Sequence, residues 1–92
     1  MYQVMIVDDE PMAASLIVNI IKQKYNKFEI MGTAYDGEEA LELMQEKGEP
    51  DILITDIQMP VMNGLKLVEE TKKQYPNVIS VIVSGYQEFE YA

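Results

Sequence analysis

Residues 4–11 read Val-Met-Ile-Val-Asp-Asp-Glu-Pro, a short apolar run that ends in three acidic residues and a proline. A continuous apolar run with β-branched members is typical of a strand that is buried on both faces of a parallel sheet. The proline suits the first position of a helix, and the apolar residues after it recur at helical spacing. This stretch therefore predicts a buried strand that leads into a helix, with two aspartates at the junction.

The same alternation of strand and helix patterns continues along the chain. Apolar strand patterns recur at 28–34, 52–54 and 78–83, and the segments between them have helical spacing. Asp36 predicts the start of the second helix, and Pro76 predicts the end of the third.

Helical spacing also predicts which side chains face the sheet. The positions expected to be buried are Ala13, Leu16, Ile17, Ile20 and Ile21 in the first helix, Ala40, Leu41 and Met44 in the second, and Leu65, Val68 and Tyr75 in the third. Residues 87–92 resemble the first turn of a further helix.

Strands that alternate with helices of this length imply right-handed crossovers and a parallel sheet with helices on both faces. The predicted fold class is α/β, a flavodoxin-like doubly wound parallel sheet with strand order 2-1-3-4. Residues 1–92 are expected to form one domain, because the chain is too short for two. In such a sheet, ligands bind at the carboxyl ends of the strands, where the strand order reverses.

The composition excludes several classes of function. The chain has 16 Asp and Glu against 7 Lys and Arg, a net charge of −9, and it has no Cys and no His. Thiol catalysis, disulfides, Ser-His-Asp triads and His-ligated zinc are therefore excluded. The acidic balance argues against direct contact with nucleic acid or anionic lipid. No signal peptide or membrane span is visible, so we expect a cytoplasmic protein.

Three carboxylates are expected to meet at one edge of the sheet. Asp8 and Asp9 follow the first strand, and Asp56 follows the third. Strands 1 and 3 are neighbours in the predicted order, so these side chains converge at the point where the order reverses. Clustered carboxylates favour a hard cation, and oxygen ligands suit Mg²⁺. The alternative interpretation is that the acidic residues at 8–10 only favour a helix N-terminus.

Asp56 comes directly after an apolar strand, on a loop that contains Pro60 and ends at Gly64. A carboxylate in this setting can act as a nucleophile that forms an acyl phosphate. Ser84 ends the fourth strand, where its hydroxyl can donate a hydrogen bond to a phosphoryl oxygen. The alternatives are an Asx-turn at Asp56 and a Ser84 hydroxyl that bonds to its own backbone.

Three motifs, with consistent spacing through the whole chain, resemble the receiver domain of two-component response regulators. They lie at 7–11, at 56–60 with Asn63 and Gly64, and at 84–85. The resemblance implies that Asp56 accepts a phosphoryl group from the phosphohistidine of a sensor histidine kinase, so that the protein is a signalling domain and not a metabolic enzyme.

The resemblance also implies a metal site and a switch. Asp9, Asp56 and the main-chain carbonyl of Gln58 would bind Mg²⁺, and Asp8 would act through a coordinated water. Ser84 would be the hydroxyl that turns toward the phosphoryl group.

The end of the chain resembles one class of these regulators. Residues 84–92 are similar to regulators whose output is an AraC-type helix-turn-helix domain, so DNA would be contacted only through that output domain. Gln58 and Tyr86 occupy positions that tune the lifetime of the acyl phosphate in such domains. A homodimer is a further expectation.

The family completes its site with a lysine after a fifth strand, and no lysine here matches that position. We therefore expect a receiver that is truncated before its fifth strand and last helices. Residues 78–83 would then form a free, apolar sheet edge, which predicts association or partial unfolding.

Three other functions compete with this one. Haloacid-dehalogenase-like phosphatases also use an aspartyl phosphate, but they need a second Asp where this chain has Gln58. A nucleotide-binding domain is disfavoured, because no Gly-rich phosphate loop follows any strand. A receiver-like module that binds partners without being phosphorylated stays open.

Overall fold

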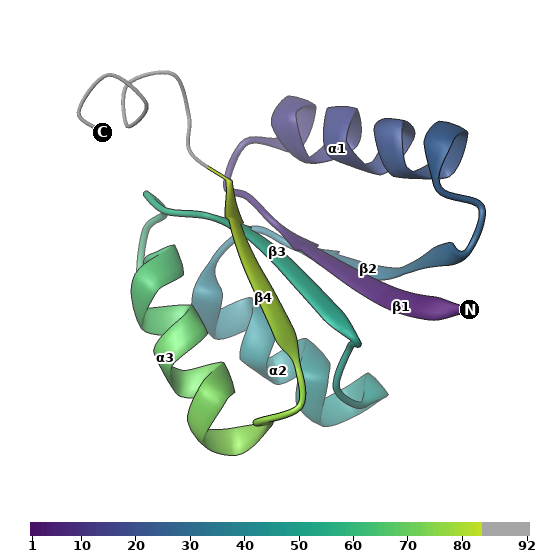
Figure 1. Cartoon of the computed structure of the whole chain (residues 1–92). Coiled ribbons are helices and arrows are strands. Elements are labelled where there is room, and N and C mark those ends of the chain that lie inside the picture. The colour runs from purple at the N-terminus through teal and green to yellow at the C-terminus, as the bar shows by residue number, and fades with distance from the viewer. Residues whose placement is uncertain (84–92) are drawn as a thin grey trace.

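The structure is a computed structural model, and it describes residues 1–83. Strands and helices alternate throughout this part of the chain, as Figure 1 shows. The elements are β1 (Tyr2–Val7), α1 (Pro11–Lys24), β2 (Phe28–Ala34), α2 (Gly37–Lys47), β3 (Ile52–Asp56), α3 (Gly64–Gln74) and β4 (Ile79–Val83). The helix predicted at 87–92 lies outside the described residues.

The four strands form one parallel sheet in the order β2-β1-β3-β4. β1 lies inside the sheet, with Val4 in register with Ile30 of β2 and with Ile52 of β3. The predicted α/β fold and the predicted strand order are both confirmed. Each link between strands that are consecutive in the chain is a crossover helix, which is why the apolar strand runs are separated by helical segments of 11 or 14 residues.

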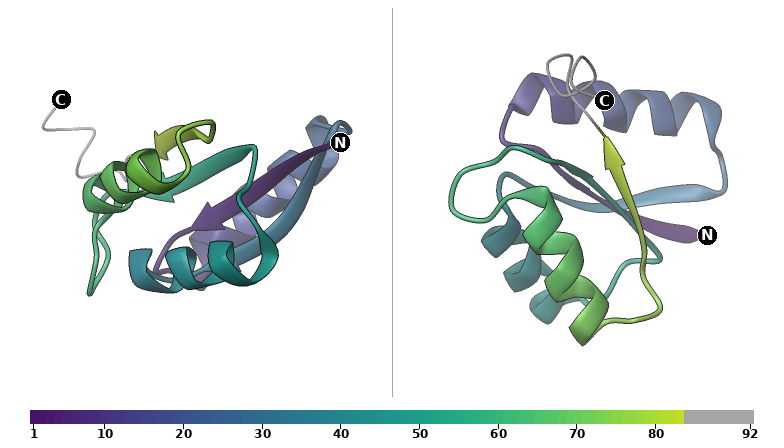
Figure 2. Two further views of the ribbon diagram at one scale, coloured as in Figure 1. Left: turned by 90° about the horizontal axis from the view of Figure 1, so that it is seen from below. Right: turned by 60° about the vertical axis from the view of Figure 1, so that its left-hand side comes forward.

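Helices cover both faces of the sheet, α1 on one side and α2 with α3 on the other (Figures 1 and 2). Successive side chains of a strand point to opposite faces, so each buried strand serves two cores. Met5 and Leu53 contact the core that Met44 and Leu67 complete. The neighbouring residues of β1 face α1. That second core is built from Val4, Ile6, Ala14 and Ile21.

Three of the predicted core positions are wrong. Leu16 and Ile20 of α1 are 62% and 43% exposed, and Leu65 of α3 is 57% exposed. Both helices are turned relative to the prediction, so that residues outside the predicted stripe are buried. In α1 the buried residues are Ala14, which the spacing did not predict, and Ile21, which it did; in α3 they include Leu67 and Thr71, neither of which was predicted. A small residue such as Ala14 lets a helix approach the sheet closely, a preference that apolar spacing alone does not reveal.

Side-chain caps fix the starts of the second and third helices. The Asp36 carboxylate accepts a hydrogen bond from the Glu39 amide at 2.8 Å, and the Glu39 carboxylate accepts one from the Tyr35 amide at 2.9 Å. This confirms the predicted N-cap. At α3, the Asn63 side chain accepts a hydrogen bond from the Lys66 amide at 2.9 Å. Both caps satisfy helix-end amides that have no partner within the helix.

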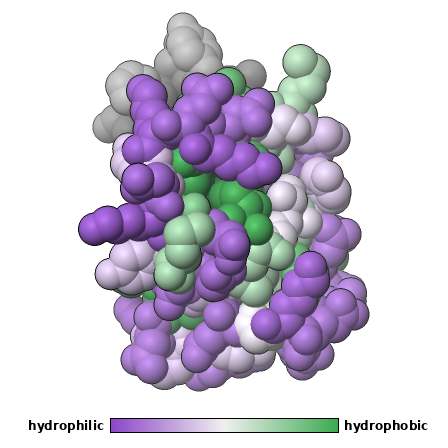
Figure 3. Space-filling view, turned by 90° about the vertical axis from the view of Figure 1, so that its right-hand side faces the viewer, coloured by the Kyte–Doolittle hydropathy of each residue, from purple (hydrophilic) through white to green (hydrophobic). Residues whose placement is uncertain are grey.

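β4 is the most exposed strand in the described part of the sheet. Ile79 is 64% exposed, Val81 43% and Val83 38%. These residues are in register with Ile52, Ile54 and Asp56 of β3, so they lie on the α1 side of the sheet. Figure 3 shows that hydrophobic atoms also reach the surface on the side where β1 begins, within a border of hydrophilic ones. Among the described helices, none is long and apolar enough to cross a membrane.

Candidate functional site

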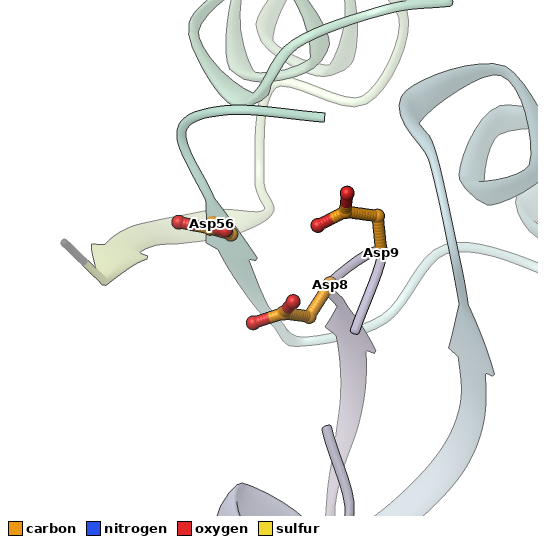
Figure 4. A group of neighbouring side chains, drawn as sticks. All are labelled: Asp8, Asp9 and Asp56. Atoms are coloured by element: carbon orange, nitrogen blue, oxygen red, sulfur yellow. The ribbon is translucent and has the colours of Figure 1, made fainter. Parts of the chain in front are cut away.

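The three predicted carboxylates lie together at the carboxyl ends of β1 and β3. β1 ends at Val7, which is in register with Thr55, so Asp8 and Asp56 leave neighbouring strands at the same level. One carboxylate oxygen each from Asp8, Asp9 and Asp56 lies within 4.8 Å of the other two. Figure 4 shows the three side chains on these adjoining chain segments, around a common space. The parallel sheet therefore brings together residues that are far apart in the sequence.

Backbone amides fix two of the three carboxylates. Asp8 is 7% exposed, and its Oδ1 accepts a hydrogen bond from the Glu10 amide at 2.9 Å. Asp56 is half-buried, and its Oδ1 accepts one from the amide of Ile57, the next residue, at 2.8 Å. Asp9 is exposed. The site thus combines two carboxylates of fixed orientation with one that water can reach.

This donor set suits a hard divalent cation. Three clustered carboxylates repel one another, and a bound cation would offset that repulsion. All the candidate ligand atoms are oxygens, which Mg²⁺ and Ca²⁺ prefer, and the exposed side of the cluster leaves room for the waters that Mg²⁺ retains. The residues present therefore fit the predicted metal.

Lys66, the lysine of α3 that is nearest to the Asp56 loop in sequence, forms ion pairs with two glutamates of its own helix. The Lys66 ammonium lies 3.2 Å from the Glu69 carboxylate and 3.6 Å from that of Glu70. The hydrogen bond from Lys66 lowers the pKa of Glu69, and the same bond raises the pKa of Lys66. Both groups are exposed, so this ion pair contributes little to stability. Lys66 thus forms these ion pairs along the surface of α3.

The loop that follows Asp56 is tightly closed. The Gly64 amide donates a hydrogen bond to the Ile57 carbonyl at 2.7 Å, and the Met62 amide donates one to the Pro60 carbonyl at 2.7 Å. Val61 has a φ of 67°, in the left-handed region that a β-branched residue rarely adopts. A loop held in this way has few alternative shapes.

Gly64 is required by the close approach of α3 to Asp56. A Cβ atom at position 64 would lie 1.9 Å from the Asp56 carbonyl oxygen and 3.1 Å from the Cα atom of Ile57. Both are backbone atoms, so no side-chain movement can relieve the overlap. The first residue of α3 therefore lies directly against the backbone of the aspartate.

The structure places the remaining predicted site residues only in part. Gln58 lies on the loop after Asp56, with its side chain exposed. Ser84 and Tyr86 lie outside the described residues. Val83, the residue before Ser84, is in register with Asp56 at the end of β4.

Sequence reasoning missed Thr55 and the Asn63 cap. Thr55 is fully buried, and its hydroxyl donates a hydrogen bond to the Asp56 carbonyl at 2.9 Å. The inward position of Thr55 follows from strand alternation, but the acceptor of its hydroxyl does not. Asn63 directly before Gly64 is a recognisable N-cap signal, and it could have given the start of α3.

Comparisons of sequence agree with the geometry. The family model of the response regulator receiver domain matches residues 4–92. YesN of Bacillus subtilis, an uncharacterized transcriptional regulatory protein, is 37% identical over 92 residues, which are 100% of this chain and 25% of that protein. The transcriptional regulatory protein HptR of Staphylococcus aureus is 41% identical over 91 residues, 99% of this chain and 35% of that protein. The chain thus spans about a quarter to a third of the length of these relatives.

Solved structures share the fold. The REC domain of AraT, a response regulator of Geobacillus stearothermophilus, is 37% identical with a TM-score of 0.86, over 98% of this chain and 69% of that one. A two component transcriptional regulator AraC from Clostridium phytofermentans is 33% identical with a TM-score of 0.83, over 100% of this chain and 73% of that one. With its parallel sheet, its acidic cluster and this match over nearly its whole length, the chain belongs to the response regulator receiver domain family.

Proposed function

We propose that this receiver domain takes a phosphoryl group onto the Asp56 carboxylate with the help of Mg²⁺, and so controls a DNA-binding output. The observation that carries the proposal is the meeting of Asp8, Asp9 and Asp56 at the carboxyl ends of two adjacent strands. In the reaction, a carboxylate oxygen of Asp56 forms a bond to phosphorus. The bond from phosphorus to the histidine nitrogen of a sensor kinase breaks, and the nitrogen keeps its electron pair.

The residues of this chain would prepare Asp56 for that attack. The Ile57 amide holds one of its carboxylate oxygens in place, so the carboxylate does not rotate freely. Asp9, Asp56 and the Gln58 carbonyl would hold Mg²⁺, and Asp8 would hold a water on the metal. When bound, the metal would offset the charge of the phosphoryl oxygens. Ser84 follows the residue in register with Asp56, and its hydroxyl would then bond to the phosphoryl group.

The proposed partners follow from the same reasoning. A sensor histidine kinase would supply the phosphoryl group. The output would be an AraC-type helix-turn-helix domain in the same protein, which alone would contact DNA because this chain carries a net charge of −9. Transcriptional regulators among the similar proteins support this proposal.

Incubation with acetyl phosphate tests the proposal. Acetyl phosphate transfers its phosphoryl group to the carboxylate and releases acetate, so intact-protein mass spectrometry should show one added phosphoryl group when Mg²⁺ is present. Chelation of the metal with EDTA should prevent the addition. A chain that binds Mg²⁺ but gains no phosphoryl group would instead support a receiver-like module that binds partners without phosphorylation.

Replacement of Asp9 should weaken metal binding without loss of the fold. Asp9 is exposed and its carboxylate belongs to a repulsive cluster, so Asp9→Ala removes a ligand and also relieves repulsion. We expect Mg²⁺ affinity to fall on the order of tenfold or more, while the free energy of unfolding stays the same or rises. NMR titration of both proteins with Mg²⁺ measures this loss, and equal responses would contradict the metal assignment.

The exposed face of β4 leads us to propose self-association of the 92-residue chain. Apolar strand residues with this exposure favour pairing with a second copy. Val81→Lys places a charge on that face and should reduce association, whereas Leu65→Lys, on the exposed surface of α3, should not. Sedimentation velocity at several concentrations measures both effects. A wild-type chain that stays monomeric throughout would contradict the proposal.

A further inference from the structure

The loop after Asp56 also contacts a part of the molecule that the site does not include, the first residue of α2. The Gly37 amide donates a hydrogen bond to the Met62 carbonyl at 3.2 Å. Gly37 is the first residue of its helix, so this amide has no acceptor within the helix and would otherwise need water or a cap. The capping side chain of Asp36 bonds to the Glu39 amide and leaves the Gly37 amide to the loop.

The contact also requires that residue 37 has no side chain. Gly37 is buried, and a Cβ atom there would lie 2.8 Å from Cγ of Met62, 2.9 Å from its Cβ and 2.9 Å from its carbonyl oxygen. These atoms lie on or next to the loop backbone, so the loop itself would have to move. The backbone φ of Gly37 does not fall in the left-handed region, so the close approach to Met62 is what demands glycine here.

Hydrogen bonds connect the Met62 segment of the loop to the carboxylate cluster. The Met62 amide is bonded to Pro60, and the Ile57 carbonyl is bonded to Gly64. The amide of the same Ile57 holds the Asp56 carboxylate. The loop is thus bonded at Met62 to α2 and at Ile57 to α3, and Asp56 and Gln58 are the residues on either side of Ile57.

From this geometry we infer that Gly37 is a positioning residue, which sets the Asp56 carboxylate and the Gln58 carbonyl by holding the Met62 segment against the N-terminus of α2. The inference rests on the proposed metal binding and phosphorylation for its functional consequence. The contact between Gly37 and Met62 does not depend on either.

Gly37→Ala tests the inference, with Gly48→Ala as the matched control at the other end of the same helix. Gly48 has a φ of 94°, and a Cβ atom added there would have no neighbour within 4 Å, so alanine strains the backbone without touching the loop. We expect Gly37→Ala to weaken Mg²⁺ binding and slow acetyl phosphate labelling roughly tenfold, because small misplacements of reacting groups have large effects on rate. Gly48→Ala should leave both unchanged, although it lowers stability.

A second substitution separates the proposed contact from a general loss of order. Met62→Gly removes the Cβ and Cγ atoms that a methyl group at position 37 would meet, although the carbonyl oxygen remains. The double variant G37A/M62G should therefore recover part of the lost Mg²⁺ affinity. If the losses of Mg²⁺ affinity caused by Gly37→Ala and by Met62→Gly simply add in the double variant, the inference is overturned. Equal Mg²⁺ affinities of Gly37→Ala and the wild type would overturn it too.

Two measurements without metal or phosphate keep the inference separate from the proposed function. The Gly37 amide of the wild type should be protected from hydrogen exchange, since it is bonded to the Met62 carbonyl. The amide signals of Ile57 and Gln58 should shift in Gly37→Ala and not in Gly48→Ala. Unchanged signals, or an unprotected Gly37 amide, would overturn the inference even if the wild type is phosphorylated. A wild type that fails to bind Mg²⁺ and to be labelled would overturn the proposed function instead.

Discussion

Asp56→Asn should abolish phosphoryl transfer to this receiver. The amide of asparagine keeps the shape of the side chain and an oxygen that can accept the hydrogen bond from the Ile57 amide. It lacks the negative charge and the nucleophilic oxygen that an acyl phosphate requires. We expect the mass increase with acetyl phosphate and Mg²⁺ to vanish, while the free energy of unfolding stays the same or rises as one charge leaves the cluster.

Asp51→Asn is the matched control for that substitution. Asp51 lies just before the start of β3, at the opposite end of the sheet, and its carboxylate accepts a hydrogen bond from the Gln3 amide at 2.7 Å. The change in charge is identical, and the side chain can still accept that bond. Asp51→Asn should be labelled like the wild type. Full labelling of Asp56→Asn would show that another residue accepts the phosphoryl group.

Gly64→Ala should produce the largest loss of stability among the glycine substitutions. Its Cβ atom would meet the Asp56 carbonyl oxygen at 1.9 Å, a distance that only a backbone shift can relieve. Overpacking of this kind costs about 1–3 kcal/mol or more. The shift also displaces Asp56, so both the free energy of unfolding in urea and the rate of acetyl phosphate labelling should fall.

Gly32→Ala separates this effect from a general intolerance of side chains. Its Cβ atom would meet Cδ2 of Leu43 at 2.7 Å, and that atom is the far end of a flexible side chain that can rotate away. We expect Gly32→Ala to keep its labelling rate and to lose much less stability than Gly64→Ala. Equal stability and labelling of Gly64→Ala and the wild type would mean that the close approach to Asp56 is not maintained in solution.

The strand order and the acidic cluster could be predicted from the sequence because both follow from few rules. Buried strands of a parallel sheet are continuous apolar runs, and the residues that follow them collect at one edge. Asp8 and Asp56 come directly after such runs, so the strand order alone was enough to predict that their side chains lie close together. The cap at Asp36 was equally local, since it depends on residues three positions apart.

The rotation of the helices and the closure of the loop could not be predicted in the same way. Leu16 and Ile20 are apolar and correctly spaced, but α1 presents Ala14 to the sheet together with the predicted Ile21. Which edge of the apolar stripe faces the sheet depends on how closely the helix fits the strands beneath it. In the same way, the contact of Gly37 with Met62 joins residues on different elements, and no local pattern in the sequence gives that distance.

The central position of β1 has a consequence for how the domain folds. Its partner β3 is distant in the chain, as the hydrogen bond between Gln3 and Asp51 across 48 positions shows. Pairing of β1 with β3 closes a long loop, so it is a non-local contact, and during synthesis it can form only after β3 has been made. The acidic cluster is assembled by that same closure. A cation bound across Asp8 and Asp56 would therefore stabilise a contact between distant parts of the chain, and if that contact is absent from the folding transition state, the cation would slow unfolding rather than speed folding.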